Sequence, residues 1–467
     1  MIYFILVIGL FLRLINLNQS LWLDEAIQAW ATSGFTLNKL ITQFMPTDVH
    51  PPLSYLVSFF TGNLIGFSEI SLRLPSVIFG VITIYVVYKI SKLIKLENQN
   101  LPTLLLATSG LHIYYSQEAR MYSLATLLVS LSIYYLIKSL KNNKFFIYYL
   151  IFTLLALYSH YYTWFMLPVH LIIVLLTHPK KLKNLLLAQT AVIIGFLPLA
   201  KTFIHQLGGG LNAATSNPGW ASVVGGLHLK SMALIPVKFL IGRITFDNKL
   251  IYAFIVAVPL LISTSLFYLL IKNTRPKADR PLDEKNSSTI ILTWLFIPLI
   301  IAILVSIKIP ILGFHRFLFV LPALYLGLSK GLSCLKPSLQ KILTIILLLV
   351  NLTTSGIYLL NPIHHREDWR GLVQELSSSN HTQAPVAILA PVRTPLIYYY
   401  AGKIINYQDI TPDFKTRELW LVPYAESIFE PFLETKKIIN TLGFKEVYQR
   451  NFRGNLILIQ YTNEDWN

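Results

Sequence analysis

The sequence is poor in charged residues and in cysteine. Only 13% of its 467 residues are Asp, Glu, Lys or Arg, against roughly 25% in ordinary soluble domains, whereas 54% are hydrophobic. This composition excludes a soluble globular protein and predicts a chain that crosses a membrane many times. Cys334 is the single cysteine, which excludes an internal disulfide and a multi-cysteine metal site. A Walker-type glycine-rich loop is also missing, so we expect no requirement for ATP.

The formal net charge of +17 does not indicate nucleic-acid binding. The basic residues recur as short lysine clusters between apolar runs and do not gather in one arginine-rich patch. Such clusters are typical of membrane topology. The first apolar run, residues 1–17, lacks a basic leading segment and a small-residue cleavage site, so we expect a retained span and not a signal peptide.

The apolar runs predict eleven transmembrane helices, because a span needs about twenty mostly apolar residues. The expected ranges are 1–17, 71–90, 101–116, 121–138, 145–160, 163–178, 185–204, 249–271, 289–307, 316–334 and 341–360. Residues 51–66 are apolar but short and begin with two prolines. This segment is therefore expected to lie in the membrane interface or to re-enter the membrane.

The distribution of Lys and Arg predicts the orientation. If the amino terminus is cytoplasmic, the inner loops hold 17 of these residues, and the outer loops before residue 361 hold 7. The positive-inside rule favours this arrangement. We therefore expect a multi-pass protein of the plasma (inner) membrane, with its polar outer loops on the extracytoplasmic face.

Residues 361–467 differ in composition from the preceding part and predict a small extracytoplasmic α/β domain after a membrane domain of residues 1–360. Helices are expected from "HHREDWRGLVQEL" and "FEPFLETKKIINTLGF", and strands from "APVAILAP", "LIYYYAG", "RELWLVPY" and "NLILIQY". The alternation suggests mostly parallel strands. The domain is either a structural cap or an element that recognises the acceptor, and Asp368 with Arg370 forms either a local ion pair or a contact to the membrane domain.

The longest outer loop before this domain covers residues 205–248. Its segment "LGGGLNAATSNPGWASVVGGL" is rich in Gly, Ser and Asn, with Trp220 near the middle. This composition is typical of a flexible connection. A lid that covers a substrate is the alternative.

Five short polar clusters fall on the outer face under this orientation. They are "LWLDEAIQAW" (21–30), "DVHPPL" (48–53), "SQEARMYS" (116–123), "SHYYTW" (159–164) and "GFHRF" (313–317). Each allows a purely structural interpretation. Asp24 and Glu25 would stabilise the start of an interfacial helix, and His50 would end a loop before two prolines. Glu118 and Arg120 would form a solvated turn, although charges so close to hydrocarbon are costly.

The aromatic and basic residues of the last two clusters have structural explanations as well. Tyr161, Tyr162 and Trp164 are typical interface aromatics, and His315 and Arg316 would contact lipid headgroups. The joint pattern favours a different interpretation. Acidic, histidine and arginine side chains that meet at one membrane face would form a polar pocket that holds an anionic headgroup and activates a hydroxyl.

The order of five motifs resembles glycosyltransferase family 39. These are "LWLDEA", "HPPLSYL", "SLRLPSVIFG", "HIYYSQEARMYSL" and "LYSHYYTWF". The family includes the protein O-mannosyltransferases and the lipid A aminoarabinose transferase, and the resemblance covers roughly residues 1–330. It implies a polytopic α-helical membrane protein of the GT-C type. It also implies an inverting transferase that moves a sugar from a polyprenyl-phosphate donor to a hydroxyl of an acceptor lipid, glycan or protein.

The resemblance also implies roles for individual residues. Asp24 would be the catalytic base, and Glu25 would orient the acceptor. Positive charge should stabilise the departing phosphate, with Arg120 and Arg316 as candidates. The full set of expected donor-binding residues is His50, Gln117, Glu118, Arg120, Tyr122, His160, Tyr161 and Arg316. Glu118 is also a candidate ligand for a divalent metal ion; metal dependence stays open, and no other cofactor is expected.

Two other functional classes are compatible with such a chain. A lipid-linked sugar transporter or flippase would more often place ionisable groups near the bilayer midplane or show inverted repeats, and neither feature is evident in the sequence. A non-catalytic lipid-binding membrane protein would not need the intact motifs. The sequence does not identify the sugar or the acceptor.

Overall fold

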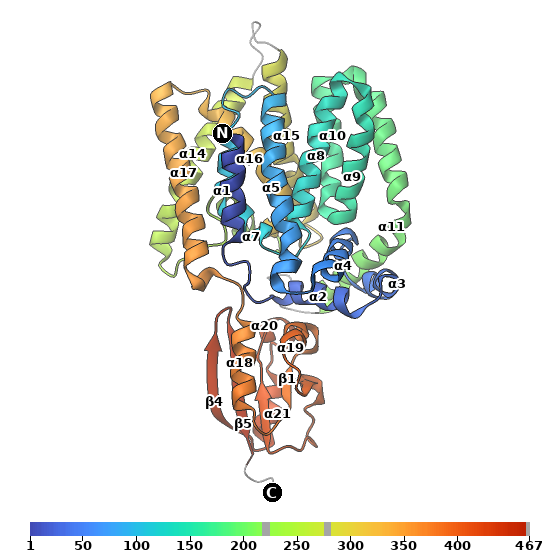
Figure 1. Cartoon of the computed structure of the whole chain (residues 1–467), viewed down its shortest axis with the longest axis vertical. Coiled ribbons are helices and arrows are strands. Elements are labelled where there is room, and N and C mark those ends of the chain that lie inside the picture. The colour runs from blue at the N-terminus through green and yellow to red at the C-terminus, as the bar shows by residue number, and fades with distance from the viewer. Residues whose placement is uncertain (217–224, 275–281, 464–467) are drawn as a thin grey trace.

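The computed structural model describes residues 1–216, 225–274 and 282–463, which form a helical bundle with a smaller α/β domain at one end (Figure 1). Within these residues, six helices are long and apolar enough to cross a membrane. They are α5 (Glu69–Leu93), α8 (Tyr122–Lys141), α11 (Leu182–Ser216), α14 (Lys249–Thr274), α15 (Leu282–Val305) and α17 (Pro337–Leu360). The chain is therefore a multi-pass helical membrane protein.

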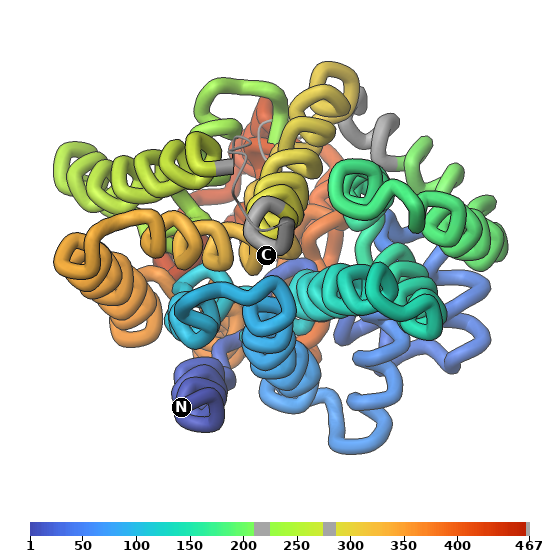
Figure 2. Tube along the Cα trace, turned by 90° about the horizontal axis from the view of Figure 1, so that it is seen from above, coloured from blue at the N-terminus to red at the C-terminus, as the bar shows by residue number. Residues whose placement is uncertain are grey.

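Shorter helices fill the other ranges in which spans are predicted. They are α1 (Ile2–Leu14), α6 (Leu101–Thr108), α7 (Gly110–Ser116), α9 (Phe146–Ser159), α10 (Met166–Thr177) and α16 (Leu321–Leu332). Figure 2, which looks along the bundle, shows α14 and α17 at one edge and α9 to α11 at the opposite edge. Large apolar side chains are exposed on the outer helices, for example Phe11 on α1 and Phe254 on α14. Such surface is stable where lipid covers it.

The predicted span 101–116 is not one helix, because the chain breaks at Ser109. The Ser109 backbone is extended, and its side chain accepts the N–H of His112 and so caps α7. Arg13 of α1 is fully buried beside the break and donates to the carbonyls of Leu106 and Ala107, which end α6. A buried guanidinium thus satisfies carbonyls that the broken helix cannot pair internally.

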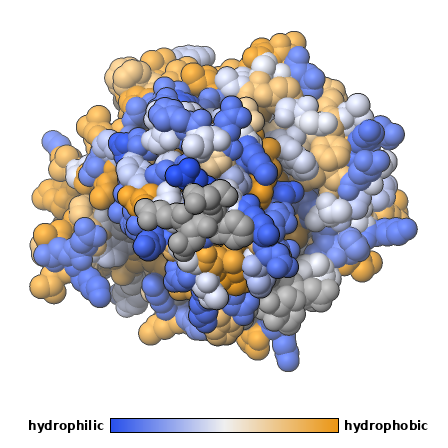
Figure 3. All heavy atoms as spheres, turned by 90° about the horizontal axis from the view of Figure 1, so that it is seen from below, coloured by the Kyte–Doolittle hydropathy of each residue, from blue (hydrophilic) through white to orange (hydrophobic). Residues whose placement is uncertain are grey.

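Helices α2 (Leu23–Gly34), α3 (Leu37–Lys39) and α4 (Leu53–Ile65) lie at the lower end of the bundle, next to the α/β domain (Figure 1). The predicted apolar segment 51–66 therefore forms α4 near the bundle end and does not add a long span. We call this the site end, because the turns that carry all five polar clusters lie here. Seen from below, with the α/β domain in front of the bundle, hydrophilic side chains gather in the middle and hydrophobic ones form much of the rim (Figure 3).

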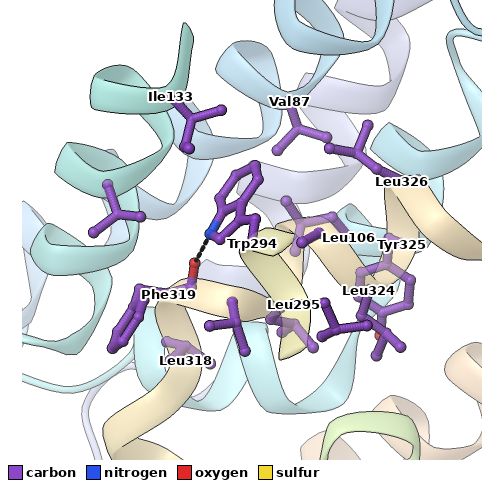
Figure 4. Packing of buried hydrophobic residues seen from close by; sticks show 14 of the residues in the cluster. Val87, Leu106, Ile133, Trp294, Leu295, Leu318, Phe319, Leu324, Tyr325 and Leu326 are labelled. Carbon is purple, nitrogen blue, oxygen red and sulfur yellow. Dashed lines mark hydrogen bonds between the residues drawn. The ribbon is translucent and has the colours of Figure 1, made fainter. Parts of the chain in front are cut away.

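Trp294 lies in the middle of the bundle core, where α5, α6, α8, α15 and α16 meet (Figure 4). Its side chain is fully buried, and its Nε1–H donates to the carbonyl of Phe319 at 3.1 Å. Phe319 belongs to the 3-10 helix η6 (Phe314–Val320), which also carries His315 and Arg316. The predicted span 316–334 is therefore η6 followed by α16, and the core holds η6 in place.

The predicted flexible loop 205–248 begins as the end of α11, which continues to Ser216 and includes the run of three glycines at 208–210, and its residues 217–224 lie outside the described residues. The chain is described again from Gly225, whose carbonyl accepts the N–H of Leu312 at 2.9 Å. It continues through α13 (Leu229–Ile241) to Arg243. The end of this loop therefore lies beside the segment that leads into η6.

The residues after α17 form a five-stranded sheet in the order β2-β1-β3-β5-β4. The strands are β1 (Val386–Ile388), β2 (Ile404–Asn406), β3 (Glu418–Leu421), β4 (Lys445–Phe452) and β5 (Leu456–Thr462), and the helices are α18 (Trp369–Ser379), α19 (Thr394–Tyr399), α20 (Glu426–Phe429) and α21 (Glu434–Thr441). Strand β1 pairs in parallel with β2 and β3, whereas β5 pairs antiparallel with β3 and β4. The expected mostly parallel sheet is therefore mixed.

Two details of this domain differ from the sequence prediction. The segment "LIYYYAG" (396–402) is not a strand; its first four residues form the end of α19, in which Leu396 is buried in the domain core. Tyr398 and Tyr399 pack instead on the α2 region of the membrane domain. Arg370 does not pair with Asp368; it contacts Glu69 of α5, so this tail residue joins the two domains.

Replacing Trp294 tests the core. Trp294→Ala should lower the free energy of unfolding by about 3–5 kcal/mol, because it leaves a cavity and removes the donor to the Phe319 carbonyl. The measurement is thermal unfolding of the full chain in detergent. Phe11→Ala is the matched control, because that ring is exposed on α1. Equal losses from both variants would contradict the central position of Trp294.

Candidate active site

Glu25 begins the site, because its carboxylate is fully buried in the first turn of α2. Arg73 of α5 donates to both carboxylate oxygens, at 2.8 and 2.6 Å, and the N–H of Ala119 donates at 2.7 Å. Burial alone would raise the pKa of Glu25, but Arg73, Arg366 and these hydrogen bonds outweigh it and lower the pKa. Glu25 is thus an ionised anchor. The predicted contact of Glu25 with an acceptor is not available in this arrangement.

Asp24, the adjacent residue, has a different environment. Its side chain is 32% exposed, and Arg120 Nη2 lies 3.8 Å from Asp24 Oδ2. Neighbouring residues on a helix point about 100° apart, so burial of Glu25 turns Asp24 toward the open side. The acidic pair therefore consists of one locked carboxylate and one accessible carboxylate.

Arg120 connects Asp24 with the "DVHPPL" loop. Its side chain is buried, and Nη2 lies 3.2 Å from the ring nitrogens of His50. Nη1 lies 3.4 Å from the Asp24 carbonyl, from Gln28 Oε1 and from the Tyr55 hydroxyl. Most of its donors thus face protein atoms. The geometry fits a residue that positions Asp24 better than the predicted direct ligand of a phosphate.

His50 is held from its other side by Asp48. The two side chains lie 3.3 Å apart, and the His50 ring remains partly exposed. Burial would raise the pKa of Asp48, but His50 and Arg120 outweigh that effect and lower it. A continuous series of polar contacts therefore runs along one side of the site, from Asp48 through His50 and Arg120 to Asp24.

Arg366, which the sequence analysis did not single out, joins the two buried carboxylates. It lies in the linker after α17 and donates from Nη1 to Glu118 Oε2 at 2.8 Å, while its Nε is 3.8 Å from Glu25 Oε2. It also donates to the carbonyls of Tyr114 and Gln117. The only sequence signal is its place in the charged stretch "HHREDWR". Through Arg366, the α/β domain contributes directly to the site.

The surroundings of Glu118 do not fit a metal ion. Burial raises the pKa of Glu118, and Arg366 offsets this effect only in part. Oε2 is occupied by Arg366, whereas Oε1 is buried without a partner among the described residues. Within the described ranges, no three His, Cys, Asp or Glu side chains gather in a way that could hold a metal ion. We therefore derive no step through a metal.

Gln117 does not reach the open part of the site, in contrast to the prediction. Its Nε2 donates to the carbonyls of Arg13 and Ile15, at 3.1 and 2.6 Å. Its Oε1 accepts the hydroxyl of Tyr358 at 2.8 Å. Both N–H donors of the amide are therefore used, and the side chain fastens α7 to α1 and α17.

Tyr161 also has a supporting position. Its hydroxyl donates to Gln206 Oε1 at 2.5 Å, and Gln206 Nε2 donates to the carbonyls of Met45 and His50. The structure thus places Tyr161 against the outer side of the His50 loop, away from the buried carboxylates.

A group of aromatic and histidine rings lies on the other side of the site from the carboxylates. We call this group the aromatic wall; it consists of Tyr122, His160, Tyr162 and His315. The ring of Tyr122 lies 5.8 Å from that of His160 and 5.3 Å from that of His315. His160 stacks on Tyr162 at 5.0 Å, and its Nδ1 is buried without a partner among the described residues. Burial and the nearby arginines lower the pKa of His315, so it is neutral near pH 7. Tyr122 and His160 thus lie together, as predicted for residues of one site.

Two arginines stand at this wall without a carboxylate partner in the part of the chain that is described. Arg316 donates to the Tyr162 hydroxyl at 2.9 Å, and its charge lies over the Tyr162 ring. Arg243, which follows α13, is exposed and lies over the Tyr114 ring at 4.7 Å. Arg243 was counted only as an outer-loop charge in the sequence. Both guanidinium groups keep donors for an anionic ligand.

Comparisons with known proteins agree with this architecture. Residues 49–204 match the family described as dolichyl-phosphate-mannose-protein mannosyltransferase. ArnT from Cupriavidus metallidurans bound to undecaprenyl phosphate is similar with a TM-score of 0.59 at 11% identity, over 98% of this chain and 96% of that chain. No curated protein sequence matches.

A second solved structure is the archaeal oligosaccharyltransferase AglB from Archaeoglobus fulgidus, in complex with an inhibitory peptide and a dolichol-phosphate. Its TM-score is 0.52 at 11% identity, over 100% of this chain and 74% of that chain. The chain thus has the GT-C fold of ArnT-like glycosyltransferases, and the resemblance predicted from the motifs is confirmed.

The different roles of Asp24 and Glu25 can be tested by neutralising each carboxylate separately. Glu25→Gln leaves Arg73 and Arg366 in excess and should cost about 3–5 kcal/mol of stability, because a buried charge loses its partner. Asp24→Asn should cost about 1 kcal/mol or less, since its side chain is partly exposed. Thermal unfolding of both variants provides the comparison. A larger loss for Asp24→Asn would show that the two roles are reversed.

Proposed function

We propose that this protein is a membrane glycosyltransferase that transfers a sugar from a polyprenyl-phosphate donor to an acceptor hydroxyl, with inversion at the anomeric carbon. The observation that carries the proposal is the partly exposed Asp24, which lies 3.8 Å from Arg120 while its neighbour Glu25 is locked. The family match and the GT-C fold support the same class of reaction. The lipid phosphates bound in the ArnT and AglB structures suggest the donor class.

Asp24 is proposed as the general base. Its carboxylate takes the proton of the acceptor hydroxyl, and the resulting oxygen attacks the anomeric carbon as the bond from that carbon to the phosphate oxygen breaks. The electron pair of the broken bond leaves with the lipid phosphate. Arg120 supports this step by fixing the orientation of Asp24, and His50 holds Arg120 in turn.

Arg243 and Arg316 are proposed to bind the lipid phosphate. Negative charge grows on the phosphate during bond cleavage, and guanidinium groups fixed beforehand stabilise that charge most effectively. Both residues stand on aromatic rings at the wall, and neither has a carboxylate partner among the described residues. His160 adds a buried ring nitrogen near Tyr122. In this proposal, Arg316 keeps the role that the sequence analysis gave it, and Arg243 replaces Arg120 as the second phosphate ligand.

The acceptor is proposed to approach from the site end, which we take to be the extracytoplasmic face from the distribution of Lys and Arg in the sequence. A lipid-linked sugar is the activated form available there, because nucleotide sugars are made in the cytoplasm. The α/β domain stands beside this approach, and its Arg453 donates to the carbonyl of Arg366, whose side chain contacts Glu118 in the site. The acceptor class is a hydroxyl-bearing lipid, glycan or protein.

Neutralising the proposed base gives the most direct test of the reaction. Asp24→Asn should reduce sugar release from a labelled polyprenyl-phosphate donor by at least about 100-fold, because general-base catalysis contributes roughly 10²–10⁴-fold. Donor binding and thermal stability should remain close to wild type. Transfer at the wild-type rate would remove Asp24 from the mechanism. Transport of intact donor without sugar release would instead identify a flippase.

The proposed phosphate site predicts weaker donor binding in two variants. Arg243→Ala and Arg316→Ala should each raise the Kd for polyprenyl phosphate about 10–100-fold, since a hydrogen bond to a charged group contributes about 1.5–3 kcal/mol. Arg393→Ala is the control, because Arg393 is exposed on the α/β domain and bonds only Asn406 among the described residues. Binding to immobilised lipid or a thermal-shift titration measures the effect. Unchanged affinity in both site variants would contradict the assignment.

A further inference from the structure

A polar pocket of about 290 Å³ lies between the α1–α2 linker and the α/β domain. Its lining includes Asn16, Asn18, Gln19, His365, Arg370 and Arg453. We call it the junction pocket. None of the residues proposed above for base catalysis or for donor binding lines it, so it is separate from the candidate active site.

The charged groups of the junction pocket favour an anion. Arg453 uses Nε to donate to the Arg366 carbonyl at 2.6 Å, and its two Nη groups have no partner among the described residues. Arg370 contacts Glu69, yet its side chain is 42% exposed. The one carboxylate of the lining, Asp368, is engaged as the cap of α18. Two guanidinium groups, with side-chain amides around them, can donate hydrogen bonds to the oxygens of a phosphate.

His365 gives a second, independent sign of a ligand. Its Nε2 is buried without a hydrogen-bond partner among the described residues, and its side chain belongs to the pocket lining. A buried polar atom without a partner costs about 1–3 kcal/mol, so such atoms are usually satisfied. An oxygen of a ligand in the pocket would satisfy this nitrogen.

The pocket lies beside exposed apolar side chains at the ends of two helices of the bundle. α1 ends at Leu14 and α17 at Leu360, and both of these side chains are exposed, as is Ile363. Figure 1 shows α18 below the lower ends of these two helices. An amphiphile can therefore rest its tail on this apolar surface with its head in the pocket. The volume is near the lower end of the roughly 300–1,000 Å³ typical of ligand sites, which suits a headgroup.

We propose that the junction pocket binds the phosphate of a membrane-lipid headgroup. The chemistry recognised is the phosphate itself, which a free phosphate ion also carries, and the apolar surface beside the pocket favours the lipid as its source. Bound there, the headgroup joins the α1–α2 linker to the α/β domain. Arg453, which lines the pocket, donates a hydrogen bond to the carbonyl of Arg366. Occupancy of the pocket therefore stabilises the position of Arg366 in the candidate active site. This inference does not depend on the proposed transfer reaction.

Thermal unfolding of the full-length chain in detergent tests the proposal through mass action, because a ligand that binds the folded state raises Tm. The probes are dihexanoyl phosphatidic acid, inorganic phosphate and dihexanoylglycerol. Phosphatidic acid should give a saturable rise in Tm, inorganic phosphate a smaller rise at equal concentration, and dihexanoylglycerol none. Equal rises with the two phosphates would assign the pocket to free phosphate and overturn the lipid source. No rise with either would overturn the site.

Variants localise the effect to the pocket. Gln374 lines the pocket from α18 and is exposed, so Gln374→Glu adds a negative charge without disturbing the core. This substitution should raise the Kd for phosphatidic acid at least about 10-fold, as expected for a like charge a few ångströms away. Gln449→Glu is the matched control, with the same change on exposed β4 outside the pocket, and should match wild type.

Arg243→Ala separates this site from the proposed donor site. If the junction pocket binds phosphatidic acid, the Tm rise persists in Arg243→Ala and weakens in Gln374→Glu. The opposite pattern, in which Arg243→Ala removes the rise and Gln374→Glu retains it, would overturn the proposal. Because the readout is Tm and not transfer, failure of the glycosyltransferase assignment leaves this test intact.

Discussion

The arrangement of the site depends on a buried set of charges at the site end of the bundle. Glu25 and Glu118 are both fully buried, and Arg73 and Arg366 are their partners. Isolated charges are very costly in such surroundings, so these groups are tolerable only together and with well-formed hydrogen bonds. The four residues come from α2, the α7–α8 turn, α5 and the linker after α17. Their pairing therefore fixes four separate segments relative to one another and makes docking of the α/β domain part of the site itself.

This constraint explains how two adjacent carboxylates acquire different roles. Because Glu25 is held by both oxygens, α2 cannot rotate about its axis without breaking the pair. Asp24 is consequently presented on the open side, beside Arg120 and the His50 loop. The opposite wall supplies Arg316 and Arg243, which lie over aromatic rings and have no carboxylate partner among the described residues, and Trp294 anchors η6 in the core. The proposed base thus lies on one side and the proposed phosphate-binding arginines on the other, which is the arrangement that the proposed inverting displacement requires.

Local patterns predicted the membrane class, most helical segments and the convergence of the acidic and basic motifs, because apolar runs and loop charges report directly on position relative to the membrane. Partners distant in sequence could not be predicted. Arg366 meets Glu118 across 248 positions, and nothing near either residue identifies the other. The amide of Gln117 is used by backbone carbonyls that become available only when α1 packs on α7. The aromatic segment around Tyr398 has strand-like composition but forms α19, because its rings pack on the α2 region of the other domain.

Arg366 and Glu118 form one unit that links the segment before the α/β domain to the candidate active site. A double-mutant cycle of Arg366→Gln and Glu118→Gln, measured by the free energy of unfolding of the full chain, tests this claim most directly. The account predicts that the double variant loses clearly less stability than the sum of the single losses, with a coupling of at least about 1 kcal/mol, because removing both charges leaves neither one buried alone. Strictly additive losses would show that the two side chains do not depend on each other and would contradict the account.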